Sequence, residues 1–358
     1  MATVEPLASA GQPPMPIQSQ RHPRPMMTSN LSISAALCTY NGARFIREQV
    51  RSICLQTHPP VEIVLSDDGS TDDCVAVARE AWQACHAERP GLDIRLQVLQ
   101  NERALGVTRN FQQAVSACRA PLIALSDQDD VWDADRLEAM SRVFSARDDL
   151  LLLHSDARLI DEAGRDLHRS LFGALGVRAS EISCIHAGQA FDVLLRRNLA
   201  TGATIVFRRE LLQRALPFPD EWLHDEWLAV IASITGGVDV LEQATIGYRQ
   251  HAANQVGAPQ GSVLRLVRKL WTARGDTHNR RAARARVLCD RLAAESSPAI
   301  APLQRKANEK LSHESARAAL PEGRLARVRP VLGELVRGRY ARFGYGMRGA
   351  IRDLLEPV

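Results

Sequence analysis

Two groups of aspartates, each following a short apolar run, are the residues in this 358-residue sequence best suited to chemistry. The first group is Asp67-Asp68, after residues 61–65, and the second is Asp127-Gln128-Asp129-Asp130, after residues 121–125. Three carboxylates within four residues repel one another unless a cation lies among them. Carboxylate oxygens suit Mg²⁺ or Mn²⁺, so the second group indicates a divalent-cation site. The first indicates a carboxylate that accepts hydrogen bonds from a nucleobase or ribose.

Each group also fits a simpler interpretation. Gly69 and Ser70 suit a tight turn before a helix, and residues 127–130 suit a solvated acidic loop that caps the next helix. Residues 127–131 also match the D-x-D-x-[TV] motif of haloacid-dehalogenase-like phosphatases, in which the first aspartate attacks phosphate. That chemistry needs a lysine in the site, whereas all three lysines lie at residue 269 or beyond. Two such groups at the ends of neighbouring strands favour a binding site.

The spacing of apolar residues predicts the elements that position both groups. Strands are expected at 31–37, 61–65, 94–99 and 121–125, and helices at 43–56, 72–88 and 106–118. This alternation predicts βαβ units and a mostly parallel sheet. Ligands of open α/β sheets bind at the carboxyl ends of the strands. Thr39, Tyr40 and Asn41, which follow the first strand, are therefore expected beside the two aspartate groups.

Beyond Asp130 the alternation weakens. A helix is expected at 134–146, strands near 151–154 and 204–207, helices at 187–196 and 225–234, and a final strand pair near 238–250. From residue 263 the pattern predicts arginine-rich helices with breaks at Pro298, Pro302, Pro321 and Pro330.

Seven motifs occur in a fixed order along residues 31–256. They are C-T-Y-N-G at 38–42, D-D-G-S-T-D at 67–72, N…G…R-N-F within 101–111, S-D-Q-D-D-V-W at 126–132, T-G-A-T at 201–204, H-D-E-W at 224–227 and Y-R-Q-H at 248–251. As a set they resemble the family 2 glycosyltransferases, which are inverting, nucleotide-sugar-dependent enzymes. The resemblance implies an α/β fold of the GT-A (Rossmann-like) type, a mostly parallel sheet flanked by helices. The forms at 126–132 and 224–227 are most similar to bacterial rhamnosyltransferase-like and galactosyltransferase-like enzymes that build surface polysaccharides.

The resemblance implies a donor site at the strand ends. Tyr40 would pack on the nucleotide base, and Asp68 would accept the base's ring N–H. Arg109, with Arg103 as the alternative, would lie near the base or the diphosphate. Gly202 would let the backbone approach the donor sugar or the acceptor. The implied donor-binding residues are Thr39, Tyr40, Asp67, Asp68, Arg109, Asp127 and Gly202.

The resemblance also implies a metal site for Mg²⁺ or Mn²⁺. Asp127 and Asp129 are the D-x-D carboxylates, with Asp129 as the principal metal ligand and Asp130 as its rival. His251 would ligate the metal or touch the diphosphate. The metal would offset charge on the leaving nucleoside diphosphate as a Lewis acid.

Asp225 matches the acidic position of a later family motif and is the implied general base, with Glu226 as the fallback. Inversion needs a base that deprotonates the acceptor hydroxyl on the face opposite the leaving group. Asp225 also suits a helix N-cap, and His224 replaces the glutamate that is usual before it. The Q-x-x-R-W motif and membrane-spanning helices of processive members are absent from the sequence, which favours transfer of a single sugar.

The charge of the chain is uneven. Its net charge is +4, but residues 261–358 contain 21 Lys+Arg against 9 Asp+Glu, which leaves 24 basic and 32 acidic residues in 1–260. Residues 263–271 interleave apolar side chains with Arg265, Arg268 and Lys269, a pattern typical of helices that lie on anionic membranes. An ordinary helical region with solvated or paired arginines is the alternative. No recognised nucleic-acid motif accompanies the arginines, so no nucleic-acid partner is expected.

Composition sets the remaining expectations. Seven cysteines without a C-x-x-C pair argue against a zinc site or a secreted disulfide framework and suit a reducing cytosol. We expect a disordered proline-rich leader at 1–30, a GT-A catalytic domain at 31–260 and a basic helical region at 261–358. The expected location is cytoplasmic, with peripheral contact at the inner face of the plasma membrane through the basic region.

These observations predict a non-processive inverting glycosyltransferase. The expected donor is a nucleoside-diphosphate sugar of the dTDP-rhamnose or UDP-hexose type, and the expected acceptor is a glycan or lipid-linked glycan. Two other classes stay open: a nucleotidyltransferase on a related α/β fold, and a non-catalytic protein that binds nucleotide sugars. A glycine-rich basic loop after the first strand would favour the former, and residues 38–44 do not form one.

Overall fold

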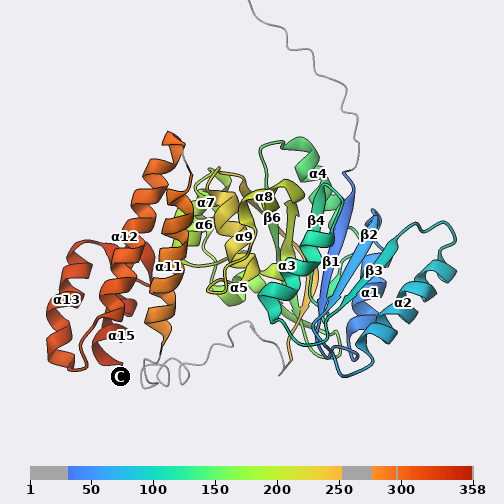
Figure 1. Ribbon diagram of the computed structural model, residues 1–358, viewed down its shortest axis with the longest axis horizontal. Helices are drawn as coiled ribbons and strands as arrows, with labels where there is room; N and C mark the ends of the chain where they lie inside the picture. Colours follow the sequence, from blue (N-terminus) through green and yellow to red (C-terminus); the bar gives the residue numbers. More distant parts are fainter. Residues whose placement is uncertain (1–30, 252–275, 296, 357–358) are drawn as a thin grey trace, which may run out of the picture.

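The computed structural model describes residues 31–251, 276–295 and 297–356 (Figure 1). The leader at 1–30 and the expected amphipathic helix at 263–271 lie outside these residues. Within the described part, no helix is long and apolar enough to cross a lipid bilayer. All seven cysteines are unpaired thiols, as the sequence predicts.

The first four strands form a parallel sheet. The strands and helices of this half are β1 (Ile33–Thr39), α1 (Ile46–Cys54), β2 (Glu62–Asp67), α2 (Cys74–Glu88), β3 (Arg95–Gln100), α3 (Val107–Ala117) and β4 (Leu122–Ser126). The strands lie in the order β3-β2-β1-β4, and each neighbouring pair is parallel. Because all run the same way, the loops after β1, β2 and β4 meet at one edge, as predicted.

The other half of the sheet mixes strand directions. It contains β5 (Val131–Trp132), β6 (Leu152–Ile160), β7 (Asp166–Ser170), β8 (Ile205–Arg208) and β9 (Val238–Arg249). Strand β8 is antiparallel to both β4 and β6, whereas β9 is parallel to β6. The predicted final strand pair is wrong, because β9 is one strand of 12 residues. Its pairing with β6 skips Glu242 and Gln243, and this irregularity interrupts the apolar pattern that the prediction used.

Short helices connect the strands of this second half. They are α4 (Arg136–Ala146), α5 (Leu171–Leu175), α6 (Ala179–His186), α7 (Ala190–Arg196), α8 (Leu212–Ala215) and α9 (His224–Ser233), with 3₁₀ turns at Gly202–Thr204 and Arg209–Leu211. Helix α6 was not expected from the spacing of apolar residues. Together with the parallel half, these elements confirm the predicted α/β sheet flanked by helices.

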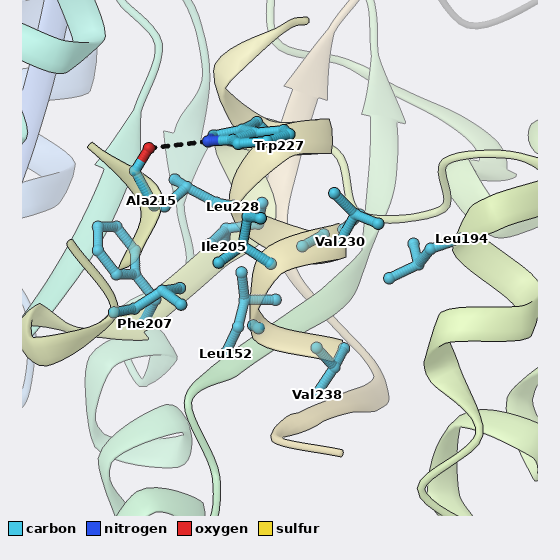
Figure 2. Packing of buried hydrophobic residues seen from close by; sticks show 14 of the residues in the cluster. Leu152, Leu194, Ile205, Phe207, Ala215, Trp227, Leu228, Val230 and Val238 are labelled. Atoms are coloured by element: carbon cyan, nitrogen blue, oxygen red, sulfur yellow. Dashed lines mark hydrogen bonds between the residues drawn. The ribbon is translucent and has the colours of Figure 1, made fainter. Parts of the chain in front are cut away.

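Two hydrophobic layers cover the two faces of the sheet. Alternate residues of β1 point to opposite sides: Ile33 and Leu37 join the layer that contains α1, α2 and α4, and Ala36 joins the layer that contains α3, α7 and α9. Figure 2 shows the second layer, in which the Trp227 indole N–H donates to the Ala215 carbonyl oxygen at 2.8 Å. Helix α9 is thereby fixed against the sheet, which matters for the residues at its start.

The C-terminal region is helical, as predicted, and packs beside α7 and α9 at the end of the molecule away from β3 (Figure 1). Its helices are α11 (Thr277–Ala293), α12 (Ala301–Ala318), α13 (Arg324–Val336), α14 (Arg339–Phe343) and α15 (Met347–Leu355), with a 3₁₀ turn at Pro298–Ile300. Pro298 and Pro302 begin elements, and Pro321 separates α12 from α13. The break predicted at Pro330 is wrong, because this proline lies inside α13.

Several charged side chains of this region are buried and paired. Asp353 accepts hydrogen bonds from Arg317 (2.6 and 2.9 Å) and from the Tyr340 hydroxyl (2.7 Å). Within the described ranges, the one group of three potential metal ligands with ligand atoms within 4.8 Å of each other is His278, Asp353 and Glu356. Its carboxylates already have arginine and histidine partners, so we interpret the group as part of an ion-pair network.

Candidate active site

The loops after β1 and β2 hold each other in place through Asp67. Its buried carboxylate accepts hydrogen bonds from the Thr39 hydroxyl (2.9 Å), the Ser70 N–H (3.0 Å) and the Ser70 hydroxyl (2.5 Å). The Ser70 hydroxyl oxygen in turn accepts from the Asn41 N–H at 2.8 Å. Asn41 has a left-handed backbone (φ 48°), which asparagine tolerates better than most residues. Thr39 and Asp67 therefore shape the strand-end loops from inside.

Asp68 holds the loop that leads into α3. Its two carboxylate oxygens accept hydrogen bonds from the backbone N–H groups of Leu105 (2.7 Å) and Gly106 (3.0 Å). The Asn101 side chain donates a longer one at 3.3 Å. Gly106 adopts φ 86°, a conformation that favours glycine. Each carboxylate oxygen has two acceptor sites, so Asp68 retains capacity for one more donor.

Gln128 joins the loop after β4 to the loop after β1. Its side-chain amide accepts from the Tyr40 N–H (2.8 Å) and donates to the Tyr40 carbonyl oxygen (3.1 Å). A side chain at Gly42 would overlap the Gln128 amide, so this close approach requires glycine. The Tyr40 side chain is 50% exposed, which leaves an aromatic surface at the strand ends.

Three carboxylates gather at the end of β4 and the start of α9. In the described part of the chain, the Asp127 side chain has no hydrogen bond and no ion pair. Burial, together with the negative charges of Asp129 and Asp225, raises the pKa of Asp127 to about 7. Asp129 contacts His251 directly, with 2.6 Å between its Oδ2 and the ring Nε2. The His251 ring also stacks on Phe45, with the centroids 5.0 Å apart.

Asp130 faces the interior. It is buried, and its Oδ1 accepts from the Arg249 N–H at 2.9 Å, while its Oδ2 has no hydrogen-bond partner among the described residues. Arg249 is itself buried and donates to the Asp129 carbonyl oxygen (2.7 Å) and to Glu48 of α1 (2.6 Å). Asp130 is therefore a structural residue, and Asp129 is the D-x-D carboxylate that faces the site with Asp127.

The residues predicted as metal ligands have side-chain types that can bind a hard divalent cation. Two carboxylates and an imidazole are ligands that Mg²⁺ and Mn²⁺ accept, and a cation would relieve the repulsion that raises the Asp127 pKa. Asp127, Asp129 and His251 do not form a group with all ligand atoms within 4.8 Å of each other. The Asp129–His251 hydrogen bond would be exchanged for metal ligation.

Asp225 lies in the first turn of α9. Its Oδ2 accepts from the Gly202 N–H (3.0 Å) and its Oδ1 from the Glu226 N–H (2.7 Å). Burial and the charge of Glu226 raise the pKa of Asp225, the hydrogen bonds oppose the shift, and the resulting pKa is about 7. A Cβ at Gly202 would lie 3.1 Å from the His224 Nε2, so glycine lets this strand-entry backbone reach the carboxylate.

The neighbours of Asp225 have different roles. His224 is buried and stacks on Phe111 of α3 with the centroids 3.8 Å apart, and neither ring nitrogen has a hydrogen-bond partner within residues 31–251, 276–295 and 297–356. Burial lowers the pKa of His224 to about 3, so the ring is neutral and packs as an aromatic side chain. Glu226 forms an ion pair with Arg284 of α11, which makes it less available as a base than Asp225.

Arg109 points away from the aspartates. Its guanidinium pairs with the exposed Asp220 at 2.7 Å, in the loop before α9. Thr108 donates to the Trp222 carbonyl oxygen in the same loop at 3.2 Å. The start of α3 is thus fastened to the segment that leads to the candidate base.

Gln128, Arg249 and Phe111 have roles that the motifs alone did not reveal. Each lies inside a recognised motif, yet it contacts a residue in an element far away in the sequence. The only sequence signal was their place beside residues with predicted roles.

The sheet order, the aspartates at the strand ends and the carboxylate at the start of a buried helix define a GT-A-type α/β protein. Residues 34–215, about half of the chain, match the family described as Glycosyl transferase family 2. The chain therefore belongs to glycosyltransferase family 2, which confirms the family and the fold predicted from its motifs.

The sequence is also similar to other bacterial proteins, two of which are described as glycosyltransferases. An uncharacterized glycosyltransferase of Nostoc sp. is 27% identical over 230 residues, which cover 63% of this chain and 66% of the relative. An uncharacterized Mycobacterium tuberculosis protein is 27% identical over 248 residues, which cover 68% and 64%. The chain thus spans slightly less than two thirds of these two relatives. The dTDP-rhamnosyl transferase RfbG of Shigella flexneri is 25% identical over 253 residues, which cover 66% of this chain and 80% of RfbG.

The fold is also similar to a solved structure. Residues 1–349 of TarS from S. aureus, in complex with UDP-GlcNAc, superpose with a TM-score of 0.54 at 14% identity. The alignment covers 90% of each chain. At this identity the likeness concerns the fold alone.

Proposed function

We propose that this protein is a non-processive, inverting glycosyltransferase that moves one sugar from a nucleoside-diphosphate sugar to an acceptor hydroxyl. The observation that carries the proposal is Asp225, a carboxylate with a pKa of about 7, held by the Gly202 N–H and close to Asp127. A base poised near neutral pH can take a proton from a hydroxyl and is still partly ionised at pH 7.

The proposed reaction is a single displacement at the anomeric carbon. Asp225 accepts the proton of the acceptor hydroxyl as its oxygen forms the new glycosidic bond. The bond to the nucleoside diphosphate breaks on the opposite face, and the diphosphate leaves with the electron pair. Gly202 and the first turn of α9 fix the Asp225 carboxylate, so the base needs no reorganisation during the step.

We propose that the donor binds across the ends of β1, β2 and β4. The exposed Tyr40 ring would pack on the base, and the spare acceptor capacity of Asp68 would receive its ring N–H. Thr39 and Asp67 would support this site from behind, and Arg109 would lie at its edge by exchanging its partner Asp220 for the diphosphate.

Asp129, Asp127 and His251 would hold Mg²⁺ or Mn²⁺, which when bound supplies positive charge that stabilises the leaving diphosphate. The nucleotide is a dTDP- or UDP-sugar in this proposal, of the rhamnose or hexose type. RfbG is named a dTDP-rhamnosyl transferase and TarS was solved with UDP-GlcNAc, and these names motivate the choice.

We propose that residues 31–260 are the catalytic domain and that the basic region 261–358 brings it to an anionic membrane with a lipid-linked glycan acceptor. One face of α13 supports this. Leu325, Leu332 and Val336 recur at helical spacing and are 90%, 53% and 88% exposed. Arg324 and Arg329 flank them, are exposed, and have no ion pair within the described part of the chain. Apolar side chains bordered by free arginines are complementary to an anionic bilayer surface.

A donor screen tests the proposed function. The whole chain is incubated with UDP-, dTDP- and GDP-sugars, with Mn²⁺, Mg²⁺ or chelator, and release of the nucleoside diphosphate is measured. Release from one donor class that depends on the cation supports a glycosyltransferase. Binding without release in any combination of donor and glycan acceptor supports the non-catalytic alternative, and release of pyrophosphate supports a nucleotidyltransferase.

A further inference from the structure

A cavity of about 380 Å³ lies between the catalytic domain and the C-terminal helices. One wall is formed by the end of α7 together with Trp222 and Glu226, and the other by α11, α12 and residues 340–352. Glu226 directly follows Asp225 in the first turn of α9, so the cavity borders the candidate active site. Small-molecule sites have volumes of roughly 300–1,000 Å³ and often lie at such boundaries.

The lining of this cavity is strongly cationic. Seven arginine and lysine side chains line it against two carboxylates, Glu226 and Glu314, and three of the arginines pair with Glu181 or Glu356 outside the lining. Arg284 pairs with Glu226, and Lys310 and Arg317 both pair with Glu314. The carboxylates on the wall are therefore already occupied by cations and leave no charge to balance a further one.

Arg281 on α11 is that further cation. It lines the cavity, and in the described part of the chain it makes no hydrogen bond and no ion pair. Burial lowers the pKa of Arg281, Glu314 opposes this, and the positive charges of Arg317 and Arg352 lower it further. An arginine nevertheless stays charged at neutral pH, so the cavity holds an uncompensated positive charge.

A partly buried cation without a partner is costly unless a ligand supplies the counter-charge. The guanidinium presents five N–H donors in a planar fork that matches a phosphate group. Trp222 and Tyr345 add aromatic surface to the same cavity for the uncharged part of a ligand. A space of this size holds one small group, and a bilayer surface or a nucleic-acid backbone cannot enter it.

We propose that this cavity binds the phosphate of a phosphorylated acceptor, with Arg281 as its principal contact, beside the base that receives the acceptor's proton. The inference rests on the proposed function and names the acceptor class. The phosphate belongs either to a free sugar phosphate or to a lipid phosphate that carries the glycan. The C-terminal helices thereby complete the acceptor site of the catalytic domain.

Calorimetric titration of the whole chain tests the proposal, with UDP and Mn²⁺ present to occupy a donor site. The probes are glucose 1-phosphate and geranyl phosphate, with methyl glucoside and geraniol as uncharged counterparts. The phosphates are expected to bind wild type more tightly than their counterparts, and R281Q to bind them about tenfold more weakly. The control is R286Q, because Arg286 lies on the same helix but is exposed and outside the cavity.

Tighter binding of geranyl phosphate points to the lipid source, and tighter binding of glucose 1-phosphate to the free sugar. Equal affinity of wild type and R281Q, equal losses in R281Q and R286Q, or no preference for phosphate overturns the proposal. R281Q removes a costly charge and no ion pair, so its unfolding temperature should equal or exceed that of wild type. R281K keeps the charge but loses the planar fork, so it should bind the phosphates more tightly than R281Q and less tightly than wild type. The titration measures binding and not transfer, so it is independent of the donor screen that tests the proposed function. If phosphate binding depends on Arg281 but the donor screen detects no transferase activity, the proposed function is refuted and the phosphate site is not.

Discussion

Half-buried carboxylates of the candidate site and fully buried carboxylates of the C-terminal helices have opposite surroundings. Among the residues that the structure describes, Asp127 after β4 and Asp225 at the start of α9 have no cationic partner, and burial with neighbouring negative charge raises the pKa of each to about 7. In the C-terminal helices, burial would also raise the pKa values of Asp353 and Glu314. There, contacts with Arg317 and Lys310 overcome the effect, and the pKa values are lowered.

The difference separates two uses of buried charge. Paired carboxylates such as Asp353 fix helices to one another, and an added ligand would have to break those pairs. Carboxylates without cationic partners make the folded state less stable, and a cation or a proton from a substrate relieves the cost. In the candidate active site the carboxylates therefore lack cations that would balance their charge. Arg281 is the corresponding cation without a carboxylate partner in the described part of the chain.

The largest expected effect is on stability in the paired region. D353N removes the charge that faces the buried Arg317, and breaking a buried ion pair costs about 3–5 kcal/mol in the free energy of unfolding. Urea unfolding of D353N and wild type measures this loss. The control is D290N, since Asp290 is exposed on α11 and should change little. Equal stability of D353N and D290N would contradict the structural role.

Next in size is the effect of a metal ligand on donor binding. D129A is expected to weaken Mn²⁺-dependent UDP binding by about 10- to 100-fold, because a carboxylate that contacts the ion is lost. Calorimetry with and without Mn²⁺ gives both affinities, with D148A as a control at an exposed aspartate. If wild type binds UDP with the same affinity in chelator and in Mn²⁺, the proposed metal has no role in donor binding.

A smaller effect is expected at the apolar face of α13. The double variant L325Q/V336Q should bind vesicles of phosphatidylglycerol and phosphatidylcholine about tenfold more weakly, because two exposed apolar side chains no longer enter the bilayer. Flotation measures the bound fraction, and L167Q on β7 is the control at another exposed leucine. If L325Q/V336Q floats like wild type, the membrane is not the partner of this face.

The last expected effect is a dependence on pH. A base with a pKa of about 7 is protonated below that pH, so kcat/KM should rise about tenfold per pH unit up to about 7 and then level off. Asp127 lies near the same pKa, so the measured value belongs to the pair. Since the folded-state pKa is raised, the stability that this group contributes is lost as pH rises towards 7. A rate that is flat from pH 5 to 8 would argue against this base.

Much of the fold could be predicted because local patterns determine it. The alternation of apolar runs gave β1 to β4 and α1 to α3, since each buried strand and helix carries its own periodicity. The strand β9 could not be predicted as one element, because its irregular pairing depends on β6. Pro330 was misread because a proline inside a helix is tolerated only in a tertiary context that the sequence does not display.

The candidate site divides in the same way. The motifs predicted roles for Asp127, Asp129 and Asp225, but they did not predict that Asp130 turns inward to meet Arg249. That orientation depends on the contact of Asp130 with Arg249, which is far away in the sequence. The environment of Arg281 could not be predicted either. It depends on how α11 packs against the rest of the protein, and in the described part of the chain this packing leaves Arg281 without an ion pair.

The central claim is that Asp225 is left without a cationic partner because it acts as the base. The most direct test combines three measurements on D225N: donor affinity, single-turnover transfer and the free energy of unfolding. We predict unchanged donor affinity, transfer lowered by about 10²–10⁴-fold, and a fold at least as stable as wild type, because a costly charge is removed. Near-normal transfer by D225N, or a loss of stability like that of D353N, would contradict the claim.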